Sequence, residues 1–132
     1  MSAKQIVQDF YTSDFFNDTS NIEKYLHKDA ELHWNASSGY AHFKKDQMHL
    51  VFSEAGKSFD EVRCGITHLL EDGDTASIRF TYFAKTIESP QEEIPLGHFI
   101  AIWEVKDGLL YKGFQMSQQP EDSPEALDSF KA

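Results

Sequence analysis

The sequence has one cysteine, few basic residues and no long apolar run. The single cysteine, Cys64, excludes an internal disulfide and a zinc site built from thiolates. Twelve lysines and arginines are outnumbered by 22 aspartates and glutamates, so the net charge is −10. This charge argues against binding to a nucleic-acid backbone or an anionic membrane, because both need clusters of basic side chains.

Two further absences concern cellular location. No stretch of about 18 apolar residues is present, so we expect no transmembrane helix and no membrane partner. The N-terminal residues lack the basic and then apolar pattern of a secretory signal. Together with the lone cysteine, these absences predict a cytoplasmic protein.

Aromatic residues, by contrast, are plentiful. The 132 residues include 11 Phe, 5 Tyr and 2 Trp, and 40% of the chain is hydrophobic. A disordered chain would lack so many aromatic side chains. A chain of this length is also suited to one folded domain, so the composition predicts a single globular unit.

Three segments have the residue spacing of amphipathic helices. Ser2 and Ser20 each begin a capping box that is followed by an apolar stripe, so we expect a helix to start after each of them. A third helix is expected over residues 44–55, where apolar residues recur at helical spacing. Gly56 is expected to follow that helix as the left-handed residue that ends it.

Alternating apolar and polar residues predict the strands, which we expect over residues 30–34, 62–70, 76–84, 96–105 and 109–117. Hairpin turns are expected at Asp72-Gly73-Asp74 and Lys106-Asp107-Gly108, so the last four strands should pair in sequence order. Tyr40 and His42 are expected in a loop. The predicted class is α+β, with the helices on one face of an antiparallel sheet.

The chain becomes polar and acidic after Gln118. Pro120 and Pro124 prevent this segment from continuing a strand. We therefore expect one domain over residues 1–118 and a loosely ordered acidic tail over residues 119–132, with a short helix at residues 124–130.

Several short sequences follow one another in a familiar order. The first is a helix–helix–strand opening over residues 6–34, in which the step from helix to strand is Leu26-His27-Lys28-Asp29-Ala30-Glu31-Leu32. The second is the segment 40–52. Two hairpins follow, at Gly73-Asp74-Thr75-Ala76 and at Asp107-Gly108-Leu109-Leu110. Over about residues 3–118 the chain resembles the nuclear-transport-factor-2-like superfamily, which includes ketosteroid isomerases and SnoaL-like polyketide cyclases. The resemblance implies a curved antiparallel sheet wrapped around the N-terminal helices as a cystatin-like cone that encloses a pocket, often in a dimer formed through the outer sheet face.

The resemblance also locates the positions where an isomerase would carry its catalytic groups. Such an enzyme needs a general-base carboxylate, together with a tyrosine and a second acid that polarise the carbonyl. The base position falls on Trp34 and the second acid near Ala101, while the tyrosine position falls on Phe10 with Tyr11 beside it. Because both carboxylates are missing, the sequence argues against steroid isomerisation and leaves other enzymatic activity open.

Inward-facing aromatic residues are expected to line a pocket for a small, mostly apolar molecule. The expected ligand-binding residues are Tyr11, Trp34, Phe52, Phe80, Tyr82, Trp103 and Gln115. Gln115 and the tyrosine hydroxyls would bind polar atoms of the ligand, because a buried polar group needs a partner. The alternative is that these aromatic side chains simply fill a core.

His68 is the one inward-facing group that could titrate near neutral pH, and it is the candidate catalytic acid or base. Its orientation depends on the hairpin that follows. A three-residue loop pairs His68 with Ile78 and points it at the core, whereas a two-residue loop pairs it with Ser77 and points it outward. Matching of the apolar residues on the two strands favours the inward orientation.

The outer sheet face carries His98, Ile100 and Ile102, and it is too apolar to suit solvent. We expect a homodimer interface there. The histidine spacings contain no metal-binding motif and the glycines form no nucleotide-binding loop, so we expect no metal and no cofactor.

Three functions remain compatible with the sequence. The first is binding of a small apolar molecule in the aromatic pocket. The second is a SnoaL-like isomerase, cyclase or dehydratase that uses His68 or a tyrosine for proton transfer. The third is a non-catalytic dimeric assembly module whose interior is filled.

Overall fold

The structure is a computed structural model that describes residues 2–131, so the first residue of the predicted domain and the last residue of the predicted tail lie outside the described residues. Within this range the chain contains α1 (Ala3–Thr12), α2 (Ser20–Tyr25), β1 (Leu26–Ala36), β2 (Gly39–Lys44), α3 (Lys45–Gly56), β3 (Phe59–Asp72), β4 (Thr75–Thr86), β5 (Glu93–Lys106), β6 (Leu109–Gln118) and α4 (Pro124–Asp128). None of the helices in residues 2–131 is long and apolar enough to span a membrane.

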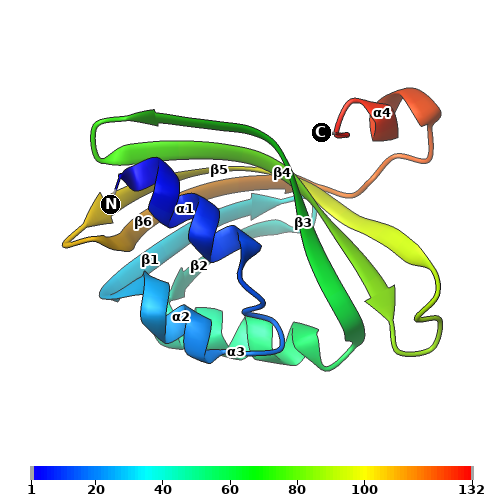
Figure 1. Cartoon of the computed structure of the whole chain (residues 1–132), viewed down its shortest axis with the longest axis horizontal. Helices are drawn as coiled ribbons and strands as arrows, with labels where there is room; N and C mark the ends of the chain where they lie inside the picture. The colour runs from blue at the N-terminus through cyan, green and yellow to red at the C-terminus, as the bar shows by residue number, and fades with distance from the viewer. Residues whose placement is uncertain (1, 132) are drawn as a thin grey trace.

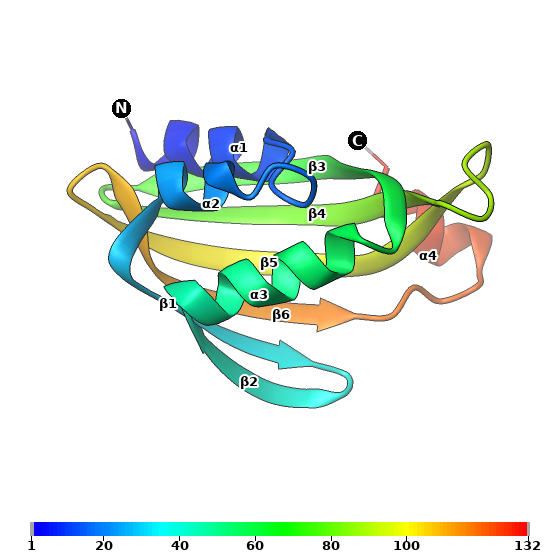
Figure 2. The ribbon, with the colours of Figure 1, turned by 90° about the horizontal axis from the view of Figure 1, so that it is seen from below.

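The strands form one curved sheet in the order β2-β1-β6-β5-β4-β3 (Figure 1). Strands β3 to β6 pair antiparallel in sequence order, as predicted, whereas β1 pairs parallel to β6. Helices α1, α2 and α3 lie on the concave side, and α4 lies on the opposite, convex side (Figure 1 and Figure 2). The predicted α+β class, a curved sheet around the N-terminal helices, is confirmed.

The hydrophobic core lies between the concave face of the sheet and α1. Ile6, Val7 and Phe10 share one face of this helix at helical spacing and are almost completely buried. They join one cluster with Ile78 and Phe80, which are alternate residues of β4. The period of two along β4 and the helical period along α1 thus meet in a single apolar layer.

The two predicted helix caps have different outcomes. The Ser2 hydroxyl accepts a hydrogen bond from the backbone N–H of Gln5, which confirms the cap of α1. The predicted cap of α2 is wrong, because Ser20 is already helical and its N–H and hydroxyl both donate to the Asp18 carboxylate. An ionised carboxylate is a stronger acceptor than a hydroxyl. These hydrogen bonds also lower the pKa of Asp18.

The segment expected to be a loop around Tyr40 and His42 is strand β2, so that expectation is wrong. β2 forms a hairpin with β1, and Gly39 at the turn has a positive φ of 122°. The alternation that predicts a strand is present over residues 40–44, but the run is short. Phe43 packs against the core from one face of β2, and this burial stabilises the strand.

Gly56 has a different role from the one predicted. It is the last residue of α3, and it is not among the described residues with positive φ, so it is no left-handed cap. A Cβ atom at this position would collide with the backbone oxygen of Phe16 and lie 2.9 Å from its carbonyl carbon. The glycine therefore allows close contact between α3 and the turn after α1.

The end of β3 turns His68 away from the core. A β-bulge lies between Ile66 and His68, and the hairpin loop holds two residues, so His68 pairs with Arg79 and is exposed. Leu69 reaches the core while Leu70 is 64% exposed. The three-residue loop and the inward orientation predicted for His68 are wrong, because a bulge moves every later residue to the opposite face.

The C-terminal segment crosses the outer face of the sheet, and α4 confirms the short helix predicted there. The Phe130 ring stacks on His98 with 3.9 Å between centroids, and the Arg79 guanidinium lies 3.6 Å from the Phe130 ring centroid. Arg79 also donates a hydrogen bond to the backbone oxygen of Ser129. His98 is consequently buried, so its predicted place on an open interface is wrong; strand alternation cannot show which distant segment covers a face.

Candidate functional site

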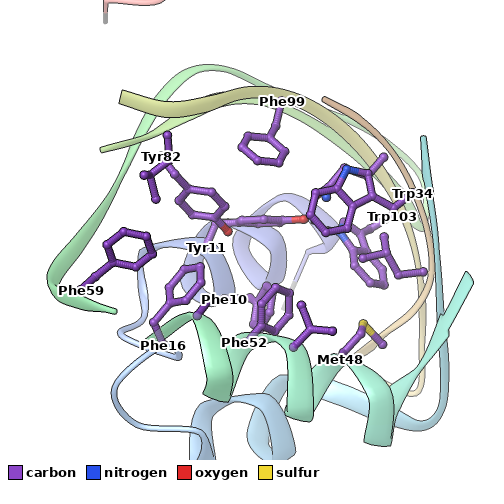
Figure 3. A pocket seen from close by; sticks show the side chains of 15 residues that line it. Phe10, Tyr11, Phe16, Trp34, Met48, Phe52, Phe59, Tyr82, Phe99 and Trp103 are labelled. Atoms are coloured by element: carbon purple, nitrogen blue, oxygen red, sulfur yellow. Dashed lines mark hydrogen bonds between the residues drawn. The ribbon is translucent and has the colours of Figure 1, made fainter. Parts of the chain in front are cut away.

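A cavity of about 150 Å³ lies between the concave face of the sheet and helices α1 and α3 (Figure 3). Phe99 approaches it from the sheet, and Phe52 and Met48 approach it from α3 on the opposite side. Most of its wall is aromatic or aliphatic. The lining residues are Phe10, Tyr11, Phe16, Leu32, Trp34, Met48, Val51, Phe52, Ala55, Phe59, Tyr82, Leu96, Phe99, Trp103 and Gln115.

The structure brings six of the seven predicted ligand-binding residues to this cavity: Tyr11, Trp34, Phe52, Tyr82, Trp103 and Gln115. Phe80 is the exception, because its side chain is completely buried and its ring stacks on Phe99 with 5.0 Å between centroids. Alternation along β4 correctly predicts which face Phe80 occupies. It does not predict that a neighbouring ring separates Phe80 from the cavity.

The other lining residues lie outside the set of seven expected ligand-binding residues. Met48, Val51 and Ala55 belong to the apolar stripe of α3, so their helical spacing indicates that they share one face of the helix. Phe16 lies in the turn after α1, and Phe59 begins β3. Neither residue belongs to a periodic pattern that would predict which way its side chain points.

Both tryptophans have their indole N–H groups engaged inside the protein. Trp103 Nε1 donates to the Tyr11 hydroxyl oxygen over 2.8 Å, and Trp34 Nε1 donates to Ser117 Oγ over 2.7 Å. The Tyr11 oxygen is therefore an acceptor for Trp103, and its own proton remains available to a further acceptor. This arrangement holds the Trp103 ring in place at the cavity wall.

Tyr82 and Gln115 provide the other polar groups of the cavity. Within residues 2–131 neither side chain forms a hydrogen bond with another protein group. Neither side chain has a fully buried nitrogen or oxygen atom that lacks a hydrogen-bond partner. Burial raises the pKa of the Tyr11 and Tyr82 hydroxyls well above the usual value, so both stay neutral. Burial also raises the pKa of the neighbouring Cys64 thiol to about 12, which keeps it from being a thiolate nucleophile near neutral pH.

The Tyr11–Trp103 hydrogen bond can be tested by removing one hydroxyl. Tyr11→Phe leaves the buried Trp103 N–H without its partner, so we expect the free energy of unfolding to fall by about 1–3 kcal/mol. Urea unfolding followed by circular dichroism measures this change. Tyr82→Phe is the matched control, because the Tyr82 hydroxyl has no protein hydrogen-bond partner within residues 2–131, and it should lose clearly less stability than Tyr11→Phe. Equal losses in the two variants would contradict the assigned role of the bond.

The cavity has no acid or base that titrates near neutral pH. Among the described lining residues there is no aspartate, glutamate, histidine, lysine or arginine. Trp34, at the position where the resemblance would place the isomerase base, lines the cavity, and Ala101 is buried without lining it. The lining also offers no set of side chains that would bind a metal ion. Chemically, this wall can enclose an apolar body and form a few neutral hydrogen bonds.

The fold and the cavity together define a cone-shaped α+β domain with an internal apolar pocket. The sequence profile of the SnoaL-like domain matches residues 7–112. The chain therefore belongs to the SnoaL-like family, and the resemblance to the nuclear-transport-factor-2-like superfamily is confirmed. No curated protein matches the sequence.

Solved structures with this fold share little sequence with the chain. IdmH from Streptomyces antibioticus, a proposed polyketide cyclase, has a TM-score of 0.70 at 15% identity, over 89% of this chain and 92% of its own. AclR from Streptomyces galilaeus, a proposed hydroxylase, has a TM-score of 0.70 at 13% identity, over 96% and 92%. An NTF2-like protein from Burkholderia pseudomallei has a TM-score of 0.63 at 17% identity, over 100% of both chains. At these identities the similarity establishes the fold alone.

Proposed function

We propose that the protein binds a small, mostly apolar molecule of about one ring in size. The observation that carries this proposal is the uncharged cavity of about 150 Å³ among aromatic side chains. An apolar cavity of about 150 Å³ is large enough to hold benzene. A filled interior, as the assembly-module hypothesis requires, would leave no such space.

The polar groups of the cavity favour a ligand that carries one hydroxyl or carbonyl group. Gln115 can donate and accept hydrogen bonds, and Tyr82 and Tyr11 each have a hydroxyl proton to donate. Leaving these groups unpaired when an apolar ligand enters costs free energy. A phenol should therefore bind more tightly than a hydrocarbon of the same shape.

Tryptophan fluorescence provides a direct binding measurement. The two tryptophans of the chain, Trp34 and Trp103, both line the cavity, so the whole tryptophan signal comes from the candidate site. We expect saturable fluorescence changes with toluene and with p-cresol, and tighter binding of p-cresol. At a ligand concentration one hundred times Kd, the protein should gain about 2.7 kcal/mol of stability.

Two substitutions on α3 provide the matched test. Val51→Phe should fill part of the cavity and weaken p-cresol binding at least about tenfold, a loss of about 1.4 kcal/mol. Leu50→Phe changes the adjacent, 64% exposed residue and should bind as the unaltered protein does. Gln115→Leu should reduce the preference for p-cresol over toluene. If neither probe saturates, or if Val51→Phe binds as tightly, the binding proposal fails.

An enzyme of the SnoaL-like kind is the second candidate, with a tyrosine rather than His68 in the pocket. The Tyr11 hydroxyl, already an acceptor for Trp103, can donate a hydrogen bond to a substrate carbonyl, which makes the α-proton easier for a water molecule to remove. Deuterium exchange at the α-carbon of small enolisable ketones tests this candidate. Exchange above the solvent rate that Tyr11→Phe removes and Tyr82→Phe keeps would support it, and exchange at the solvent rate would rule it out.

We also propose a homodimer formed through the outer face of β5 and β6. Ile100 and Met116 are cross-strand neighbours, as are Ile102 and Phe114, and these four side chains are 43–68% exposed. A continuous exposed apolar patch of this kind is typical of an interface between subunits. It replaces the predicted patch, from which the C-terminal segment removes His98.

The mass of the protein in solution tests the dimer. We expect light scattering to give twice the chain mass of 15.1 kDa. Ile102→Lys should shift the mass to that of one chain, because a charge in an apolar interface is costly. Leu50→Lys, on the opposite side of the sheet, should leave the dimer intact. A single-chain mass for the unaltered protein at all concentrations would exclude the interface.

A further inference from the structure

Three potential metal ligands meet on the convex face of the sheet, away from the cavity. We propose that Glu31, His33 and His42 form a binding site for a borderline divalent ion such as Zn²⁺. One ligand atom from each residue can be chosen so that all three lie within 4.8 Å of one another. The site is built from this chain's own residues and does not depend on the proposed ligand-binding function.

The β1–β2 hairpin brings the three side chains together. His33 and His42 are directly opposite each other in the register, and Glu31 lies two residues before His33 and so on the same face. The two imidazole rings are 4.6 Å apart between centroids. The alternate residues of β1, Leu32 and Trp34, line the cavity, so Glu31 and His33 point away from it.

The contacts around the cluster suit a metal site. His42 Nε2 lies 3.1 Å from Glu31 Oε1, and His33 Nδ1 lies 2.8 Å from the Tyr40 hydroxyl. Since Nδ1 of His33 is engaged, its Nε2 is left to coordinate an ion, as in sites where an outer partner orients the imidazole. Among the described residues, the only basic side chain within salt-bridge distance of Glu31 is His42, and a shared ion can replace this contact.

The donor set points to the kind of ion. Two imidazoles and one carboxylate are typical ligands of zinc, whereas calcium and magnesium prefer oxygen donors alone. Three protein ligands leave a fourth, tetrahedral position for water. Glu31 and His33 are partly buried and His42 is exposed, so an ion can reach the site from solvent.

Calorimetric titration of tag-free, chelator-treated protein with Zn²⁺ tests the site. We expect one ion per chain. His42→Gln and His33→Gln should each weaken binding at least about tenfold, and Tyr40→Phe should weaken it about tenfold through loss of the outer contact. Titration with Co²⁺ should produce the visible absorption of a low-coordinate N/O site. Histidines that only stabilise the fold, without binding a metal ion, would not produce this absorption.

His68→Gln is the matched control, because His68 is exposed on β3 at the opposite edge of the sheet. It should bind zinc as the unaltered protein does. Circular dichroism verifies that each variant folds, and exposed His42 provides the deciding variant if His33→Gln does not fold. The proposal is overturned if no ion binds stoichiometrically, or if His42→Gln binds as tightly as His68→Gln. p-Cresol binding is measured separately, so either proposal can fail alone.

Discussion

Replacement of Gly56 by alanine is expected to lower the free energy of unfolding by about 3 kcal/mol, at the upper end of what overpacking usually costs. The added Cβ would collide with the backbone oxygen of Phe16, and neither the helix end nor the turn can move as easily as a side chain. Because α3 forms one wall of the cavity, the displaced helix should also weaken p-cresol binding.

The sign of this effect distinguishes steric contact from helix propensity. In a helix, alanine is ordinarily more favourable than glycine by about 0.5–1 kcal/mol. Ser53→Ala, on the same helix, is the control and should change stability by less than about 0.5 kcal/mol. Urea unfolding measures both variants. A stabilised Gly56→Ala protein would show that α3 does not need the close approach to Phe16.

Gly113→Ala is expected to cost about 2 kcal/mol of stability, through overpacking of the buried Trp103 side chain. Gly113 lies opposite Trp103 in the register, and an added Cβ would lie 2.7 Å from Trp103 Cη2 and Cζ2. The indole is also held by Tyr11, so it cannot move without breaking that hydrogen bond. A displaced indole should change the cavity wall and weaken p-cresol binding.

Gly97→Ala provides the comparison for Gly113→Ala. Its Cβ would lie 3.1 Å from Phe99 Cε1, a contact that a shift of a few tenths of an ångström can relieve. We expect a smaller loss of stability than at Gly113, measured by urea unfolding, and p-cresol binding measured by tryptophan fluorescence should be less affected. Equal losses at the two positions would argue against a tightly held Trp103.

The SnoaL-like fold does not by itself determine the chemistry of this protein, which depends on the side chains of its cavity. The resemblance places the isomerase carboxylate positions at Trp34 and near Ala101, where this chain has no carboxylate, and the cavity lining among the described residues has only neutral hydrogen-bonding groups. Burial raises the pKa values of both tyrosine hydroxyls, so they can donate hydrogen bonds but not act as bases near neutral pH. These features favour binding, or at most polarisation of a carbonyl, over proton abstraction by the protein.

The periodicity of apolar residues predicts much of the fold, because it indicates which face of each helix or strand is buried. The helical stripe of α1, the alternation of β4 and the sequence-order pairing of β3 to β6 are examples. Strand β2 is not predictable in this way, because its alternating run is short and packing of Phe43 against the core stabilises it. The proposed zinc site cannot be predicted from the sequence for the same reason, since it needs the hairpin that places His42 opposite His33.

By itself, the sequence determined the α+β class, the family resemblance and six residues of the cavity wall, because residue spacing and composition encode which side chains face inward. Only the tertiary structure decided the orientation of His68, the burial of Phe80 and the covering of His98. Each of these depends on a bulge, a neighbouring ring or a distant segment of chain. Such contacts between residues far apart in sequence leave no period in the sequence itself.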